Sequence, residues 1–200
     1  RGYGLSKLLG FSAVALTTWM LVAWDVFDFS GTLVWWVFGA SAALGLVVAT
    51  LRRDSLVLDV QERWRSWITL EVVFLAVFAA FLLFRYTNPD LWHPFRGGEK
   101  PMELSYLTAV IRSTEMPPFD PWFGGGTMNY YYMGWFFLAV PIRALQIVPE
   151  VAFNLAIPTY GALAAIVGAS TVHNLVALGS IKRGVKARAW WRPAGAVAIL

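Results

Sequence analysis

Long apolar stretches alternate with short polar segments in the first part of the chain. The apolar stretches run from about Leu8 to Val26, from Leu33 to Leu51 and from Ile68 to Phe84. Each is close to the roughly 20 residues that an α-helix needs to cross the hydrocarbon core of a bilayer. The pattern therefore predicts about three transmembrane helices within residues 1–86.

The polar connections between these stretches differ in charge. The linker after the first stretch, DVFDFSGT, is short and acidic, whereas residues 52–65 are rich in arginine. Cytoplasmic loops of membrane proteins carry an excess of Lys and Arg. We therefore expect residues 52–65 to be cytoplasmic, so that the third apolar stretch delivers the chain to the outside.

The pattern changes in residues 87–129, which hold six of the ten prolines and no long apolar run. Within them, Glu99–Glu115 predicts a helix, because Pro101 is tolerated in a first turn and Pro117 and Pro118 would end it. Its apolar residues at helical spacing are Met102, Tyr106, Ala109 and Val110. We expect an amphipathic helix that lies parallel to the membrane surface, within a long extracytoplasmic loop.

Two further apolar segments follow, at about Tyr131 to Val148 and Ala152 to Leu178. With the third stretch they make three potential spans between the basic residues 52–65 and the basic segment SIKRGVKAR. An odd number of spans would place the second basic segment outside, against the positive-inside rule. Either one segment is not a simple span, or the last one, broken at Pro158, crosses twice or re-enters.

Composition supports the same class of protein. The chain is 58% hydrophobic and 14% charged, whereas a soluble domain has roughly 25% charged residues. The sequence therefore predicts an all-α fold, a polytopic transmembrane helix bundle, in a multi-pass protein of the plasma membrane. The chain begins without Met and ends in an apolar run, so we expect a fragment in which residues 130–200 are further, truncated transmembrane helices.

Charge and cysteine content exclude several kinds of function. The net charge of +4 comes from short basic connections, so it does not indicate nucleic-acid binding. The absence of cysteine excludes disulfides, thiolate metal sites and a cysteine nucleophile from this chain.

The loop of residues 87–129 concentrates side chains that suit a phosphate head with an apolar tail. Carboxylates act as general bases or hold divalent cations, Arg and Lys pair with phosphate, and aromatic rings stack on sugars. The carboxylate candidates are Glu99 and Asp120, and the substrate-contact candidates are Arg96, Lys100, Arg112, Trp122 and Asn129. As alternatives, Glu99 would decorate a solvated helix face and Asp120 would be a turn residue. No metal-ligand spacing is recognisable, which leaves a divalent metal and any other cofactor open.

Three consecutive tyrosines, Tyr130, Tyr131 and Tyr132, mark the change from this loop to the next apolar segment. They suit either an aromatic belt at the membrane interface or the wall of a site. Three consecutive residues on a helix spread over about 200 degrees, so at least one would face the protein interior. This spread favours a site.

Several motifs in order carry a resemblance to a known family. RGYGLSK, NPDLWHP, GGEKPM, RSTEMPPFDPW, NYYYMG and VAFNLA, between Arg1 and about Ala156, resemble the YYY membrane-protein family of bacteria and archaea, uncharacterised multi-span proteins. More distantly, the layout is similar to that of the C-type (GT-C) glycosyltransferases. That likeness implies that Glu99 stands in the place of their catalytic carboxylate and Asp120 in a second acidic position. Their paired acidic motif is Glu99-Lys100 here, a departure that bears on metal dependence.

The resemblance implies sugar transfer from a polyprenyl-phosphate donor held in membrane lipid. Glu99 would take a proton from the acceptor hydroxyl, and Lys100, Arg112 or Arg96 would stabilise the departing phosphate. The tyrosines and Trp122 would shape the pocket. The alternative is a non-enzymatic transporter or structural subunit, although transporters usually carry charged or broken helices at mid-membrane.

Overall fold

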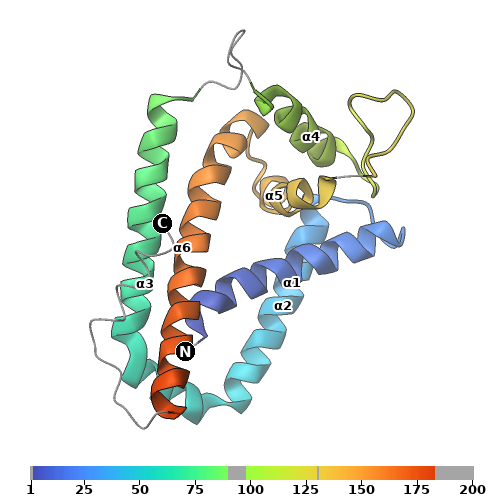
Figure 1. Ribbon diagram of the computed structural model, residues 1–200. Helices are drawn as coiled ribbons and strands as arrows, with labels where there is room; N and C mark the ends of the chain where they lie inside the picture. The colour runs from blue at the N-terminus through green and yellow to red at the C-terminus, as the bar shows by residue number, and fades with distance from the viewer. Residues whose placement is uncertain (1, 90–97, 130, 183–200) are drawn as a thin grey trace. The chain divides into compact units, whose positions relative to one another are not determined.

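The computed structural model describes the backbone of residues 2–89, 98–129 and 131–182, and these ranges contain helices and no strand. The helices, in order, are α1 (Tyr3–Ala23), α2 (Gly31–Leu51), α3 (Arg53–Thr87), α4 (Lys100–Arg112), α5 (Tyr132–Leu145) and α6 (Pro149–Lys182) (Figure 1). The all-α class predicted from the sequence is confirmed. The helix predicted within Glu99–Glu115 is confirmed as α4.

Four helices are long and apolar enough to cross a membrane, by length and composition: α1, α2, α3 and the Pro149–Leu178 part of α6. Helices α2 and α3 contain their predicted spans, and α1 covers the first predicted span up to Ala23. Helix α3 is longer than its span, because the basic segment is helical from Arg53 onward and only Arg52 separates it from α2. No Gly or Pro interrupts residues 53–87, and an Asp59–Arg63 ion pair of 3.2 Å supports the polar turns.

Helix α5 is too short to be a simple span. Its 14 residues extend about 21 Å at 1.5 Å per residue, short of the roughly 30 Å hydrocarbon core. Helix α6 runs without a break through Pro158, which it buries, so it does not double back there. Of the two alternatives posed by the sequence, the structure therefore supports the first, in which one apolar segment is not a span. If α3 and α6 both cross, the two basic segments lie on the same side, as the positive-inside rule requires.

The chain divides into two compact units. The first unit comprises residues 1–10, 54–87 and 157–200, and the second comprises residues 11–53 and 88–156. Helices α1 and α6 therefore contribute to both units.

In the first unit, α3 and α6 lie side by side (Figure 1). Small residues of α6 face α3 at this contact. Val77 of α3 is buried with Ala162 and Ala165, and the ring of Phe81 lies over Gly161. A Cβ at Gly161 would come within 3.3 Å of that ring, so the small residue permits the close approach. Val77 contacts Ala162 and Ala165, and Phe81, one turn later in α3, contacts the earlier residue Gly161 of α6. The two helices are therefore antiparallel.

A polar cluster holds the first turns of α1 against α3. Glu71 accepts a hydrogen bond from the Tyr3 hydroxyl at 2.5 Å and pairs with the Lys7 ammonium, whose Nζ is 2.7 Å from Oε2. The Tyr3 ring stacks on Trp67 with centroids 5.0 Å apart. Glu71 lies inside the apolar stretch of α3, where an ionised side chain is costly unless it is paired.

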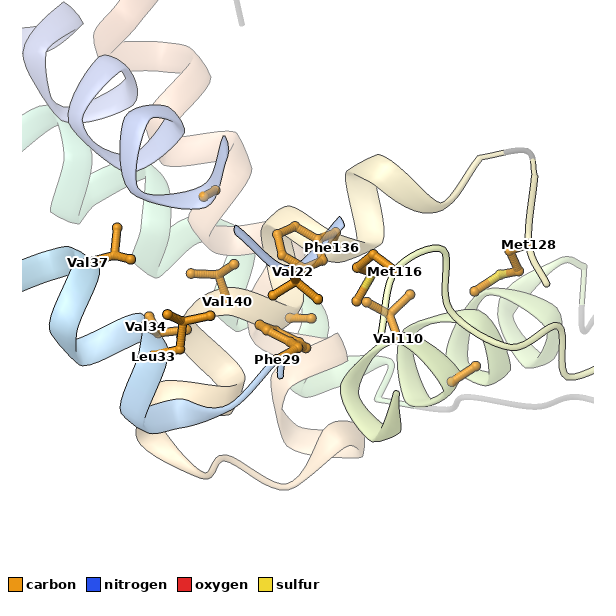
Figure 2. Close-up of a cluster of buried hydrophobic side chains, with 13 residues drawn as sticks. Val22, Phe29, Leu33, Val34, Val37, Val110, Met116, Met128, Phe136 and Val140 are labelled. Carbon is orange, nitrogen blue, oxygen red and sulfur yellow. The ribbon is translucent and has the colours of Figure 1, made fainter. Parts of the chain in front are cut away.

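The core of the second unit is built around α5. Phe136 of α5 and Phe29 of the α1–α2 linker are fully buried, with ring centroids 4.9 Å apart. Figure 2 shows valines from α1, α2, α4 and α5 near these two rings, together with Met116 from the segment after α4. The face of α5 that carries Phe136, Ala139, Val140 and Ile142 is thus covered by protein, mostly by α2 and α4.

Hydrogen bonds fasten the end of α5 to the α1–α2 linker and to α2. The Arg143 guanidinium donates to the Phe29 carbonyl at 3.0 Å and lies over the Phe29 ring. The Trp35 indole donates to the Ala144 carbonyl at 3.0 Å. Gly31 lies against the Arg143 carbonyl, and a Cβ there would come within 2.6 Å of its oxygen.

The Lys7–Glu71 pair should contribute measurably to stability. Its side chains are 34% and 36% exposed, so we expect a coupling energy of about 1 kcal/mol, the upper end for accessible pairs. A double-mutant cycle of Lys7→Met and Glu71→Gln, followed by reversible unfolding in mixed detergent micelles, measures it. The Asp59–Arg63 pair is the control and should give about 0.3 to 0.5 kcal/mol. Additive effects at Lys7 and Glu71 would show that the pair contributes nothing.

Two glycines of α1 provide a second, matched test. Gly10 has open space at its Cβ position, so Gly10→Ala should stabilise the helix by roughly 0.5 to 1 kcal/mol. A Cβ at Gly4 would overlap the Ser170 hydroxyl and lie 2.9 Å from the Ile166 carbonyl oxygen of α6. Gly4→Ala should therefore lower the free energy of unfolding in the same assay, and an equal gain at both positions would contradict the α1–α6 contact.

Candidate functional site

Glu99 stands immediately before the first turn of α4. Gly98 turns the chain at a φ of +55°, and Pro101 follows in the first helical turn. The Glu99 carbonyl accepts the Glu103 amide at 2.9 Å, but the Glu99 side chain makes no capping hydrogen bond. The carboxylate is therefore exposed, at the end of the helix where the peptide dipoles favour negative charge.

Lys100 is the cation nearest to Glu99 along the described chain. It is half-buried, and as the next residue it lies about 100 degrees around the α4 axis from Glu99. Arg112 ends the same helix, so it lies roughly 20 Å from Glu99 along the axis. Lys100 and Arg112, at opposite ends of α4, are therefore too far apart to contact one phosphate group together.

Asp120 uses its carboxylate within a turn. Its Oδ1 accepts the Trp122 amide at 2.8 Å, and its own amide donates to the Gly126 carbonyl at 2.9 Å. The Trp122 indole donates to the Ser105 hydroxyl at 3.0 Å, which ties the turn to the middle of α4. This is the turn role that the sequence offered as the alternative for Asp120.

Tyr131 and Tyr132 are not consecutive residues of one helix, although the predicted 200-degree spread assumed that they are. Helix α5 begins at Tyr132, and Tyr131 precedes it with a left-handed backbone, φ +68°. Tyr132 does face the interior, where its hydroxyl accepts the Trp19 indole N–H at 3.2 Å. Tyr131 is 58% exposed and meets the Trp135 ring edge to face at 6.2 Å. Asn129, just before them, is exposed.

The predicted site residues thus fall in separate places. Glu99 and Lys100 lie at the start of α4, Asp120 and Trp122 lie beside its middle, and Tyr132 packs in the core. Arg96 and Tyr130 lie outside the described residues, as do Asp90 and His93. Within the described ranges, no group of three or more His, Cys, Asp or Glu side chains could hold a metal ion.

The sequence did not predict a groove of about 410 Å³ beside α4. One face of α4 forms its floor and the residues after α4 form its wall. Its lining includes Pro101, Leu104, Thr108, Arg112, Phe119 and Pro121. The α4 residues on the floor recur at spacings of three and four, and this periodicity was the signal in the sequence that could have revealed the groove. Around the α4 axis this face lies opposite to Glu99 and Glu103.

The turn role of Asp120 can be tested by two substitutions. Asp120→Asn keeps an oxygen that accepts the Trp122 amide, so the turn should persist. Asp120→Ala removes the acceptor and should cost about 1 kcal/mol locally. Limited proteolysis within residues 119–127 should then be faster for the alanine variant alone. Equal protection of both variants would show that the carboxylate does not hold the turn.

Comparison with known protein families gives a match over most of the chain. A family model described as an uncharacterized membrane protein, DUF2298, matches residues 13–200. No curated protein and no solved structure matches the chain.

Proposed function

This chain belongs to the uncharacterized membrane protein family DUF2298, and we propose that it is a membrane glycosyltransferase. It would move a sugar from a polyprenyl-phosphate donor to an acceptor at the extracytoplasmic face of the plasma membrane. The observation that carries the proposal is Glu99, an exposed carboxylate that neither caps its helix nor pairs with a described residue. A general base must be free to reach the proton that it abstracts.

In the proposed reaction, the Glu99 carboxylate takes the proton of the acceptor hydroxyl as its oxygen attacks the anomeric carbon of the donor sugar. The bond between that carbon and the phosphate oxygen breaks, and the electron pair leaves with the phosphate. The Lys100 ammonium, next to Glu99, stabilises the negative charge that develops there. The proposal assigns this role to Lys100 rather than to Arg112, because Arg112 lies at the far end of α4.

The remaining predicted contacts keep subsidiary roles in the proposal. Tyr131 and Asn129 are exposed where the chain enters α5, so they are available to a sugar hydroxyl. Tyr132 supports this wall from inside through the Trp19 indole. Asp120 acts through the turn that it holds rather than on the substrate.

The outer location of the site is supported by a contact between distant segments. The Phe29 amide, in the α1–α2 linker, donates to the Thr114 carbonyl, after α4, at 2.7 Å. Two segments that are bonded directly must lie on one side of a membrane. If α2 and α3 both cross, the chain returns after α3 to the side of the α1–α2 linker. The basic residues at the start of α3 lie on the opposite side. Under the positive-inside rule, the side of the α1–α2 linker is therefore the outside.

Glu99→Gln tests the proposal, because the amide keeps the shape and cannot accept the proton. We expect the transfer rate to fall roughly 100-fold or more, as for the loss of a general base. Cells that express wild type, Glu99→Gln or Glu115→Gln at equal level are compared for lipid-linked sugars and surface glycans by mass spectrometry. Glu115 is exposed and lies beyond α4, so its variant should match wild type.

Two outcomes would contradict the proposal. Equal product from wild type and Glu99→Gln would remove Glu99 from the chemistry. No difference between wild type and cells without the protein would favour the alternative, a transporter or structural subunit.

A further inference from the structure

The chain after α4 forms a short hairpin, residues 118–128, with a fixed base. Phe119 pairs with Thr127 as an isolated antiparallel bridge, and the Met128 amide donates to the Pro118 carbonyl at 2.8 Å. Pro118 and Met128 are buried at this base, and Met128 belongs to the core around α5. The hairpin extends from the carboxyl end of α4 (Figure 1). The packing of this base in the core therefore fixes the position of the hairpin.

The surface of this hairpin is aromatic and carries no free charge. Phe119, Trp122 and Phe123 are 46%, 64% and 69% exposed. Asp120 is the one charged residue between positions 116 and 129, and its carboxylate is bonded to the Trp122 amide. A cluster of exposed aromatic side chains indicates a surface that binds an apolar or amphipathic partner.

The groove beside the hairpin adds a positive charge to this surface. Phe119 and Pro121 of the hairpin form its wall, and Arg112 is the charged residue among those that line it. Arg112 is exposed, and no ion pair or hydrogen bond occupies its guanidinium among the described residues. An apolar channel with a guanidinium at one end complements a phosphate ester with a hydrocarbon chain.

We propose that the hairpin and this groove dock on the phospholipid of the bilayer that holds the protein. Trp122 and Phe123 enter the headgroup layer, where aromatic side chains are enriched. Arg112 pairs with a lipid phosphate, and the adjoining part of an acyl chain lies against Leu104 and Thr108. This binding does not depend on sugar transfer, because Glu99 lies on the opposite face of α4.

Chain connectivity supports a lipid partner rather than a soluble one. Along the chain, the hairpin comes after α3 and before α6, and both of these helices are long and apolar enough to cross a membrane. Only α5 and short connections separate it from the first residue of α6. A surface tethered on both sides in this way meets a bilayer at high effective concentration.

The chain has no cysteine, so one introduced thiol reports on one position. Phe123→Cys carries an environment-sensitive fluorophore in the protein reconstituted into nanodiscs of phosphatidylcholine and phosphatidylglycerol. We expect blue-shifted emission that lipids spin-labelled near the headgroup quench and aqueous iodide does not. Glu115→Cys, labelled in the same way, is the control and should show aqueous emission quenched by iodide.

Each further result decides a part of the proposal. Aqueous emission at position 123 would overturn membrane docking. Blue-shifted emission that spin-labelled lipids leave unquenched would also overturn it, because protein would then cover the tip. Adding Arg112→Gln should move the emission toward that of the control. An unchanged spectrum would show that Arg112 does not bind lipid phosphate.

Discussion

Phe136 packs on Phe29 at the centre of the second unit, and this contact decides what α5 can be. An apolar helix next to a membrane has two places to bury its surface, in lipid or in protein. Helix α5 has 14 residues, too few for lipid, and its side chains meet α2 and α4 instead. The α1–α2 linker is drawn into the same core, because Phe29 belongs to it.

The candidate site follows from the burial of α5. Helix α4 is short and its intrinsic helical stability is small, so packing against α5 has to hold it. Leu107 and Val110 supply that packing and leave the first residues of α4 outside the core. Glu99 is consequently presented on a rigid element while its carboxylate remains accessible. A site built in this way is more precise than one on a free loop.

The sequence predicted the elements well where length and prolines decided them, and poorly where packing did. Helices α1 to α3 followed from apolar runs, and α4 followed from Pro101 and Pro117. Helix α5 was counted among the potential spans, because composition does not reveal whether lipid or protein covers it. Pro158 looked like a break, yet α6 continues through it, and the proline side chain is fully buried.

Individual site residues were predictable from local chemistry, but their separation was not. The turn around Asp120 needs only residues two apart, and the sequence allowed it. The groove forms only because the hairpin folds back beside α4. Glu99 and Arg112 are far apart because the whole length of α4 separates them. At least one of the three tyrosines was expected to face inward because of the helical spread, and Tyr132 does so, although α5 begins only at that residue.

The polar cluster of the first unit also has a consequence for synthesis. Lys7 precedes its partner Glu71 by 64 residues, and α2 lies between them in the chain. When α1 leaves the ribosome, Glu71 has not yet been made, so lipid headgroups and water must solvate the ammonium until α3 arrives. The synthesis of α1 and its fastening to α3 are therefore separate events in time. The ion pair closes only after α3 has been made.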